Sequence, residues 1–134
     1  MNRMLDTDIC IYIIKHKPPQ VLAAFLTFQP GEIAISSISV AELMYGAIKS
    51  RKPEQNLSAI EHFLMPLTIL SFDETCAAIY GSVRADLEKA GTPIGSLDML
   101  IAAHALQRGL IVVTNNTREF TRVAGLVVEN WTTS

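Results

Sequence analysis

Acidic and amide side chains that could share a metal ion occur at four widely separated places in the sequence. They are Asp6, Glu42, Asp98, and the neighbouring pair Asn116 and Glu119. Oxygen donors of this kind are the ligands that Mg²⁺ and Mn²⁺ prefer, and no His or Cys spacing offers softer ligands for zinc. If these side chains meet in the folded chain, they could hold a divalent ion that activates water for a hydrolytic reaction.

The elements that would position these residues alternate between short strand-like runs and longer helical ones. Strands are expected at residues 3–5, 33–35, 67–70, 110–113 and 126–128. Helices are expected through Ile9–Ile14, from Pro18-Pro19 through Leu26, from Ser39 through Ala47, from Pro53 to Met65, from Asp73 to before Gly91, over Leu97–Gln107 after a Ser96 cap, and around Arg118–Arg122. This alternation predicts one α/β domain over residues 1–134, in three layers, with a mostly parallel sheet of four to five strands flanked by helices.

In such a sheet, side chains that follow the strands gather at one edge. Asp6 directly follows the first expected strand, and Glu42 and Asp98 lie in the first turns of two expected helices. Asn116 follows the fourth strand, with Glu119 three residues later. We therefore expect distant segments of the chain to deliver these oxygens to the same place.

Each residue also has an ordinary structural interpretation. Asp6 could cap the first helix. Ser39-Val40-Ala41-Glu42 matches a capping box, in which the glutamate serves its own helix start. Asp98 could simply favour the helix dipole, and Asn116 could be a turn residue. Taken singly, none of them establishes a site.

The environment expected for Asp98 favours the metal interpretation. On helical spacing Asp98 shares a face with the apolar residues Ile101 and Ala105, and its helix has no Lys or Arg before Arg108. A carboxylate at the edge of an apolar surface needs a compensating partner. The same holds for Asp6 at the end of a central strand, and a shared metal ion would compensate both.

Composition limits the class of protein. The formal net charge is −2 with a pI near 5.9, which argues against a protein that holds nucleic acid mainly by bulk positive charge. It does not exclude an enzyme acting on RNA, because a bound metal ion supplies local positive charge. The basic residues are grouped and are expected at solvated helix ends: Lys15 and Lys17; Lys49, Arg51 and Lys52; Arg118 and Arg122.

Other features predict a soluble, cytoplasmic protein. No stretch reaches the roughly 18 apolar residues that a membrane helix needs, and an acid at position 6 argues against a signal peptide. Cys10 and Cys76 are expected to be buried small hydrophobes, and His104 a hydrogen-bonded core residue.

Four sequence blocks together resemble the PIN-domain toxins of the VapC type. They are Met4–Asp8, Ile35–Leu43 with Tyr45–Ala47, Gly91–Ala102 with His104–Ala105, and Leu110–Phe120. Each block alone is a weak signal, but all four occur in the family's order and spacing over the whole chain. The resemblance implies a PIN-like fold and an endoribonuclease that hydrolyses RNA phosphodiester bonds, with tRNA or another structured RNA as substrate.

The resemblance also implies roles for single residues and partners. Asp6, Glu42 and Asp98 correspond to the acidic cluster that binds Mg²⁺, with Mn²⁺ as a substitute. Asn116 stands where many relatives have an aspartate, so Glu119 is the candidate to supply the missing charge. The implied partners are a small VapB-like antitoxin and a second copy of the chain in a homodimer. Phosphate contacts would come from the basic residues Lys15, Lys17, Lys49, Arg51 and Lys52.

Three other classes compete with this interpretation. Asp6-Thr7-Asp8 imitates the Asp-x-Asp motif of haloacid-dehalogenase-type phosphatases, although the residues that follow depart from that pattern. A phospho-receiver domain would need a lysine after the fifth strand, where this chain has Glu129. A non-catalytic PIN-like binding module, with Asn116 marking a lost site, is the third alternative.

Overall fold

Five short parallel strands form the centre of the protein in the computed structural model, which describes residues 1–133. The strands are β1 (Arg3–Leu5), β2 (Ile33–Ser36), β3 (Thr68–Leu70), β4 (Ile111–Val113) and β5 (Val128–Glu129). Their order in the sheet is β3-β2-β1-β4-β5, so β1 is the central strand and pairs with both β2 and β4. The predicted parallel α/β sheet is confirmed.

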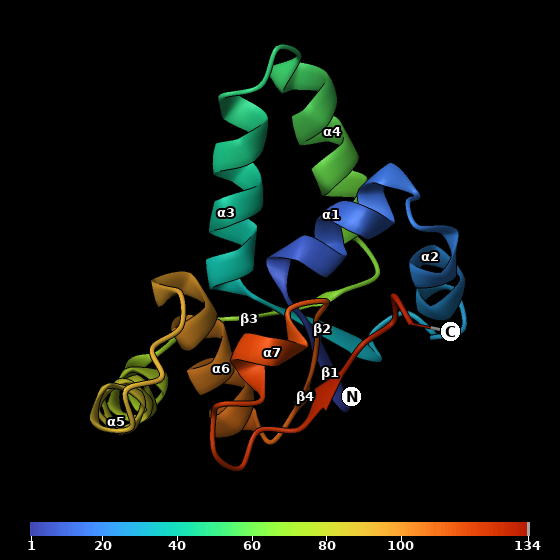
Figure 1. Ribbon diagram of the computed structural model, residues 1–134. Helices are drawn as coiled ribbons and strands as arrows, with labels where there is room; N and C mark the ends of the chain where they lie inside the picture. Colours follow the sequence, from blue (N-terminus) through green and yellow to red (C-terminus); the bar gives the residue numbers. More distant parts are fainter. Residues whose placement is uncertain (134) are drawn as a thin grey trace.

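Helices cover both faces of this sheet (Figure 1). They are α1 (Thr7–Lys15), α2 (Pro19–Phe25), α3 (Ser37–Ile48), α4 (Pro53–Leu64), α5 (Glu74–Lys89), α6 (Ser96–Arg108) and α7 (Thr117–Phe120). None of the helices in residues 1–133 is long and apolar enough to cross a membrane.

The alternation of side chains along each strand separates two apolar cores. Met4 and Val112 pack with side chains of α5, α6 and α7 on one face. Their neighbours Leu5 and Val113 pack with α1, α2, α3 and α4 on the other. Successive strand residues point to opposite faces of a sheet, and both faces here are apolar because both are covered. This arrangement explains why the strands read as continuous apolar runs.

The order of the strands creates a crevice at the carboxyl ends of β1 and β4. The chain runs from β1 outward to β2 and β3, and then crosses to the other side of β1 to form β4. Ligands of open α/β sheets bind at such a switch point. The first residues of α1, α3, α6 and α7 lie around this edge of the sheet (Figure 1).

The start of helix α3 differs from the sequence-based prediction. Helix α3 begins at Ser37, and its cap is Ser36, whose Oγ accepts a hydrogen bond from Ile38 N; the predicted start at Ser39 is wrong. The last residue of β2 is itself the cap, so strand passes into helix without a loop. Glu42 therefore lies in the second turn of α3, not in the first.

The other differences are smaller. At α6 the cap position is Gly95, which makes no side-chain cap hydrogen bond, so Ser96 is the first helical residue and not the cap. The last strand starts at Val128 instead of Leu126, because the chain turns at Gly125 and the backbone N–H of Leu126 donates a hydrogen bond to the carbonyl oxygen of Val123. Cys10 and Cys76 are both buried and free, as predicted.

Candidate active site

Asp6 is enclosed at the junction of β1 and β4. Its side chain is only 2% exposed. Asp6 Oδ1 accepts a hydrogen bond of 2.9 Å from Ile9 N, and Oδ2 accepts one from the hydroxyl of Thr114. Thr114 is also fully buried and accepts the backbone N–H of Asn116 at 2.8 Å. Asp6 therefore caps α1 and, in addition, is held by the first residue after β4.

Burial is unfavourable for the charged form of this carboxylate. It raises the pKa of Asp6 from 3.8 to about 6, and the negative charges of Asp8 and Glu42 add to the effect. The hydrogen bonds from Thr114 and Ile9 act in the opposite direction but do not cancel the effect of burial. A nearby cation would restore the ionised form.

Glu42 reaches across from α3 to the start of α1. Its Oε1 accepts a hydrogen bond of 2.7 Å from the hydroxyl of Thr7, the residue after Asp6. The same hydroxyl lies 3.1 Å from Oγ of Ser39, which is fully buried inside α3. The capping-box interpretation is therefore wrong, because Glu42 and Ser39 both meet Thr7 and neither closes a helix end.

Asp98, Asn116 and Glu119 form a second group at the same edge. Asn116 Nδ2 lies 3.3 Å from Asp98 Oδ2 and also donates to Glu119 Oε2. Asn116 is thus more than a turn residue, since its amide joins two acids. Burial, followed by the hydrogen bond and charge of Glu119, raises the pKa of Asp98 from 3.8 to about 7. The charges of Asp6 and Asp8 raise it further, which shows that the two groups of acids act on one another.

No basic side chain neutralises these acids within the part of the chain that the structure describes. The ion pairs among residues 1–133 are Arg3 with Glu129 and Arg84 with Glu88, and neither includes a member of the two groups. The sequence-based expectation of uncompensated carboxylates is therefore met. An excess of negative charge is the condition in which a metal ion stabilises the folded protein most.

The donor set fits a hard divalent cation in its chemistry. All candidate donors are carboxylate or amide oxygens, and two of the carboxyls have raised pKa values. Within residues 1–133, no three His, Cys, Asp or Glu side chains are already gathered closely enough to surround an ion. Mg²⁺ requires little direct protein ligation, because it usually keeps several waters and is bound through one or two carboxylates.

Comparison with known proteins assigns the family. The PIN-domain profile matches residues 3–126. The chain is 50% identical over 128 residues to the tRNA(fMet)-specific endonuclease VapC of Shigella flexneri, which covers 96% of both chains. It is 52% identical over 131 residues to ribonuclease VapC2 of Haemophilus influenzae, covering 98% of both. The chain belongs to the PIN-domain family, in its VapC group.

Solved structures of similar proteins support the same family assignment over nearly the whole chain. A chain in a crystal structure of DNA-bound VapBC from Salmonella typhimurium is 46% identical and superposes with a TM-score of 0.92, covering 98% of each chain. A chain of VapBC2 from Rickettsia felis, bound to a promoter DNA fragment, is 43% identical with a TM-score of 0.91 and covers 98% and 99%. The three-layer fold predicted from the resemblance is confirmed.

Three hydroxyl residues of this PIN domain were missed as members of the site. Thr114 is signalled by its position directly after a buried strand, where it stands at the switch point. Thr7 carries no such signal, because a threonine at the first position of a helix is common. Ser39 was assigned to the wrong role, since its burial depends on where α3 begins. Hydroxyls in a site of this kind orient the carboxylates instead of replacing them.

Proposed function

We propose that this PIN domain is a divalent-metal-dependent endoribonuclease and the toxin of a toxin–antitoxin pair. The observation that carries the proposal is that Asp6, Glu42 and Asp98 lie at one edge of the sheet without a basic partner among residues 1–133. They are near enough that the charge of Glu42 raises the pKa of Asp6 and the charge of Asp6 raises that of Asp98. The relatives at about half identity, which are named ribonucleases and tRNA endonucleases, support this reaction.

Asp6, Asp98 and Glu42 would hold the metal ion. When bound, Mg²⁺, or Mn²⁺ in its place, supplies positive charge that polarises a phosphate and lowers the pKa of water. Thr114 orients the carboxylate of Asp6, and Asn116 orients those of Asp98 and Glu119. The carboxylate of Glu42 or of Glu119 would accept a proton from the attacking water.

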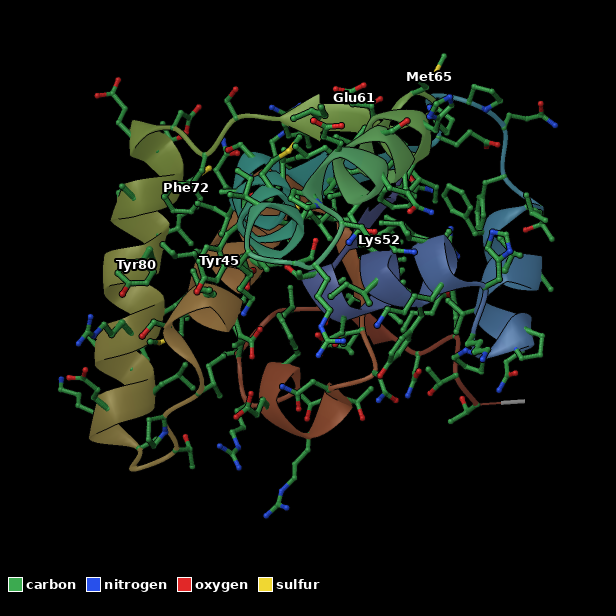
Figure 2. The ribbon with its side chains drawn as sticks, turned by 90° about the horizontal axis from the view of Figure 1, so that it is seen from above. Tyr45, Lys52, Glu61, Met65, Phe72 and Tyr80 are labelled. Atoms are coloured by element: carbon green, nitrogen blue, oxygen red, sulfur yellow. The ribbon has the colours of Figure 1, made fainter. Side chains whose placement is uncertain are left out.

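The RNA backbone would be held by exposed basic residues, one beside the site and three beyond the C-terminal end of α3. Lys15 lines a groove together with Glu42. Lys49, Arg51 and Lys52 follow the C-terminal end of α3. They are far from the first residues of this helix, because a helix of 12 residues is about 18 Å long. Nζ of Lys49 lies 4.8 Å from the centre of the ring of Tyr45, an exposed side chain of α3 that is labelled in Figure 2. Phosphate contacts there would bind RNA well beyond the cleaved bond, as expected for a structured substrate such as tRNA.

The partner we propose is a VapB-like antitoxin. Solved relatives are VapBC complexes, in which toxin and antitoxin are bound together. The groove beside Glu42, of about 330 Å³, is lined mostly by apolar residues of α1, α3 and α4, with polar residues such as Lys15 and Asn56 among them. It would seat an apolar segment of such a protein next to the acids. A homodimer of the toxin chain is part of the same proposal.

The proposal is tested by incubating the purified protein with total RNA in Mg²⁺ or in EDTA and mapping new 5′ ends. We expect discrete cleavage in tRNA with Mg²⁺ and none with EDTA. Asp98→Ala should lower the rate at least about 100-fold without unfolding the chain. The protein encoded by a neighbouring open reading frame, when added in equal amount, should stop the cleavage.

Other outcomes would decide against parts of the proposal. RNA binding without new 5′ ends would identify a non-catalytic module. Cleavage in EDTA, or full activity of Asp98→Ala, would contradict the assigned metal site. Turnover of a small phosphomonoester with no cleavage of RNA would favour a phosphatase.

A further inference from the structure

His104 is a buried histidine that makes a single polar contact. It lies on α6, is fully buried, and its Nδ1 is 2.8 Å from Oγ of Ser36. Its other ring nitrogen, Nε2, has no hydrogen-bond partner among residues 1–133. The prediction of a hydrogen-bonded core histidine is thus correct for only one of the two nitrogens.

Stability of the core alone does not explain this residue. A buried polar atom without a partner costs more than one neutral hydrogen bond gains, so an apolar side chain of similar size would suit the core better. Burial also lowers the pKa of His104, so the ring is neutral and forms no ion pair in compensation. The location of the single hydrogen bond of His104 therefore needs an explanation other than core stability.

That hydrogen bond ends where α3 begins. Ser36 is the last residue of β2 and the cap of α3, and its Oγ also accepts Ile38 N at 3.1 Å. Among residues 1–133, the contact between His104 and Ser36 is the only side-chain hydrogen bond that joins α6 to the β2–α3 segment. It links the helix that carries Asp98 to the helix that carries Glu42.

A neighbouring loop closes the pocket around the ring. Phe72, in the segment between β3 and α5, packs edge-on against His104 with ring centres 5.6 Å apart. The backbone N–H of Phe72 donates to Oγ of Ser37 at 3.0 Å, which fixes this loop to the start of α3 as well. Figure 2 shows Phe72 beside the N-terminal end of α5. The imidazole ring is therefore fully enclosed by its neighbours and has little freedom to tilt.

From this geometry we propose that His104 is a positioning residue that sets the placement of Asp98 relative to Glu42. The inference rests on the proposed metal-dependent cleavage. Asp98 and His104 are six residues apart on one helix, about 9 Å along its axis. The hydrogen bond between His104 and Ser36 resists a small tilt of α6. Without this bond, such a tilt would displace Asp98. Displacements of about 1 Å in a catalytic group are enough to reduce rates by up to about 100-fold.

Two substitutions separate positioning from packing. His104→Asn places an amide where Nδ1 lies and can keep the bond to Ser36, although the smaller side chain leaves a cavity. His104→Gln fills the space better but places its amide where the unpartnered Nε2 lies, so the bond to Ser36 is lost. If His104 serves packing alone, the Gln variant should be more stable and more active than the Asn variant. If His104 positions Asp98, the Asn variant should bind metal and cleave RNA better than the Gln variant.

The test measures Mn²⁺ binding by calorimetry together with RNA cleavage kinetics and thermal unfolding. We expect His104→Gln to bind Mn²⁺ about 10-fold more weakly and to lose about 10-fold in kcat, with KM for RNA nearly unchanged. His104→Asn should recover most of both losses despite an equal or lower melting temperature. If the Gln variant unfolds, His104→Leu takes its place in the comparison with His104→Asn, because it removes the bond to Ser36, keeps an apolar side chain of similar size and leaves the cap of α3 intact.

The outcomes distinguish this inference from the proposed function. Mn²⁺ affinity and kcat of the Gln variant equal to those of the wild type, or losses that follow the melting temperature in both variants, would overturn the positioning role. A wild-type protein that binds no Mn²⁺ and cleaves no RNA would instead overturn the proposed function.

Discussion

The two groups of acids in this site are built differently. Asp6 is 2% exposed, caps a helix, and is held by a buried threonine that directly follows the neighbouring strand. Asp98 is only partly buried, and its side-chain partner is Asn116, which is itself shared with Glu119. One carboxylate is thus fixed by the sheet, and the other belongs to a more open cluster of three residues.

This difference indicates a division of labour. The enclosed acid is held by one backbone N–H and one hydroxyl, and no other carboxylate in residues 1–133 shares these two partners. The open cluster has two carboxylates around one amide, so the loss of one leaves another nearby. A rigid first ligand with adjustable further ligands suits a metal ion that must also accept a phosphate and water.

The largest expected effect separates the two groups by activity. Asp6→Asn should lower the rate of RNA cleavage by about 1,000-fold, and Asp98→Asn by about 100-fold, because Glu119 can partly replace Asp98. Both rates are measured with the same RNA at saturating Mg²⁺. Equal losses in the two variants, or the larger loss in Asp98→Asn, would show that the enclosed acid is not the principal one.

The second prediction concerns stability and pH in the metal-free protein. Asp6 and Asp98 have folded pKa values of about 6 and about 7, above the value of 3.8 expected in the unfolded chain. The folded protein therefore retains protons that the unfolded chain has lost, and stability falls as the pH rises from about 4 to about 7. For the enclosed Asp6 alone the decrease is about 3 kcal/mol. Asp98 is more exposed and contributes less.

Urea unfolding of the metal-free protein at about pH 4 and about pH 7.5 measures this decrease, and added Mn²⁺ at the higher pH should reverse it. Asp6→Asn should remove most of the pH dependence and Asp98→Asn a smaller part. A stability that rises over this range in the wild type would contradict the assigned burial of Asp6.

The smallest effect sharpens the description of the enclosed acid. Thr114→Val removes the hydroxyl that lowers the pKa of Asp6, so that pKa should rise further and the rising limb of the pH–rate profile should move to higher pH. The lost hydrogen bond should also reduce the free energy of unfolding by about 1 kcal/mol. Thr114→Ser keeps the hydroxyl and is the matched control, with a wild-type profile expected.

The sheet and the approximate location of the acids followed from patterns in the sequence. Apolar runs bounded by Pro, Gly and capping residues placed all five strands and the long helices, and the rule that polar residues gather at strand ends brought Asp6, Asp98 and Asn116 together. The start of α3 could not be predicted, because both Ser36 and Ser39 are good caps. Only the pairing of β2 with β3 up to Ser36 decides between them.

The contacts within the site depend on details that periodicity does not contain. The hydrogen bond from Thr7 to Glu42 requires the relative rotation of α1 and α3, and the sharing of Asn116 requires the path of the loop after β4. The resemblance to VapC-type proteins supplied the acidic residues by position, but it offered no information on these hydroxyls. The roles of the acids in binding metal, the single-domain organisation and the location in the cell stay predictions.

The strand order has a consequence for how the protein is made. The central strand β1, at residues 3–5, is synthesised long before one of its two neighbours, β4, at residues 111–113. The enclosure of Asp6 by Thr114 can form only after residue 114 has left the ribosome. Until then a nascent chain is without its complete site, although it is already attached to the messenger RNA that encodes it.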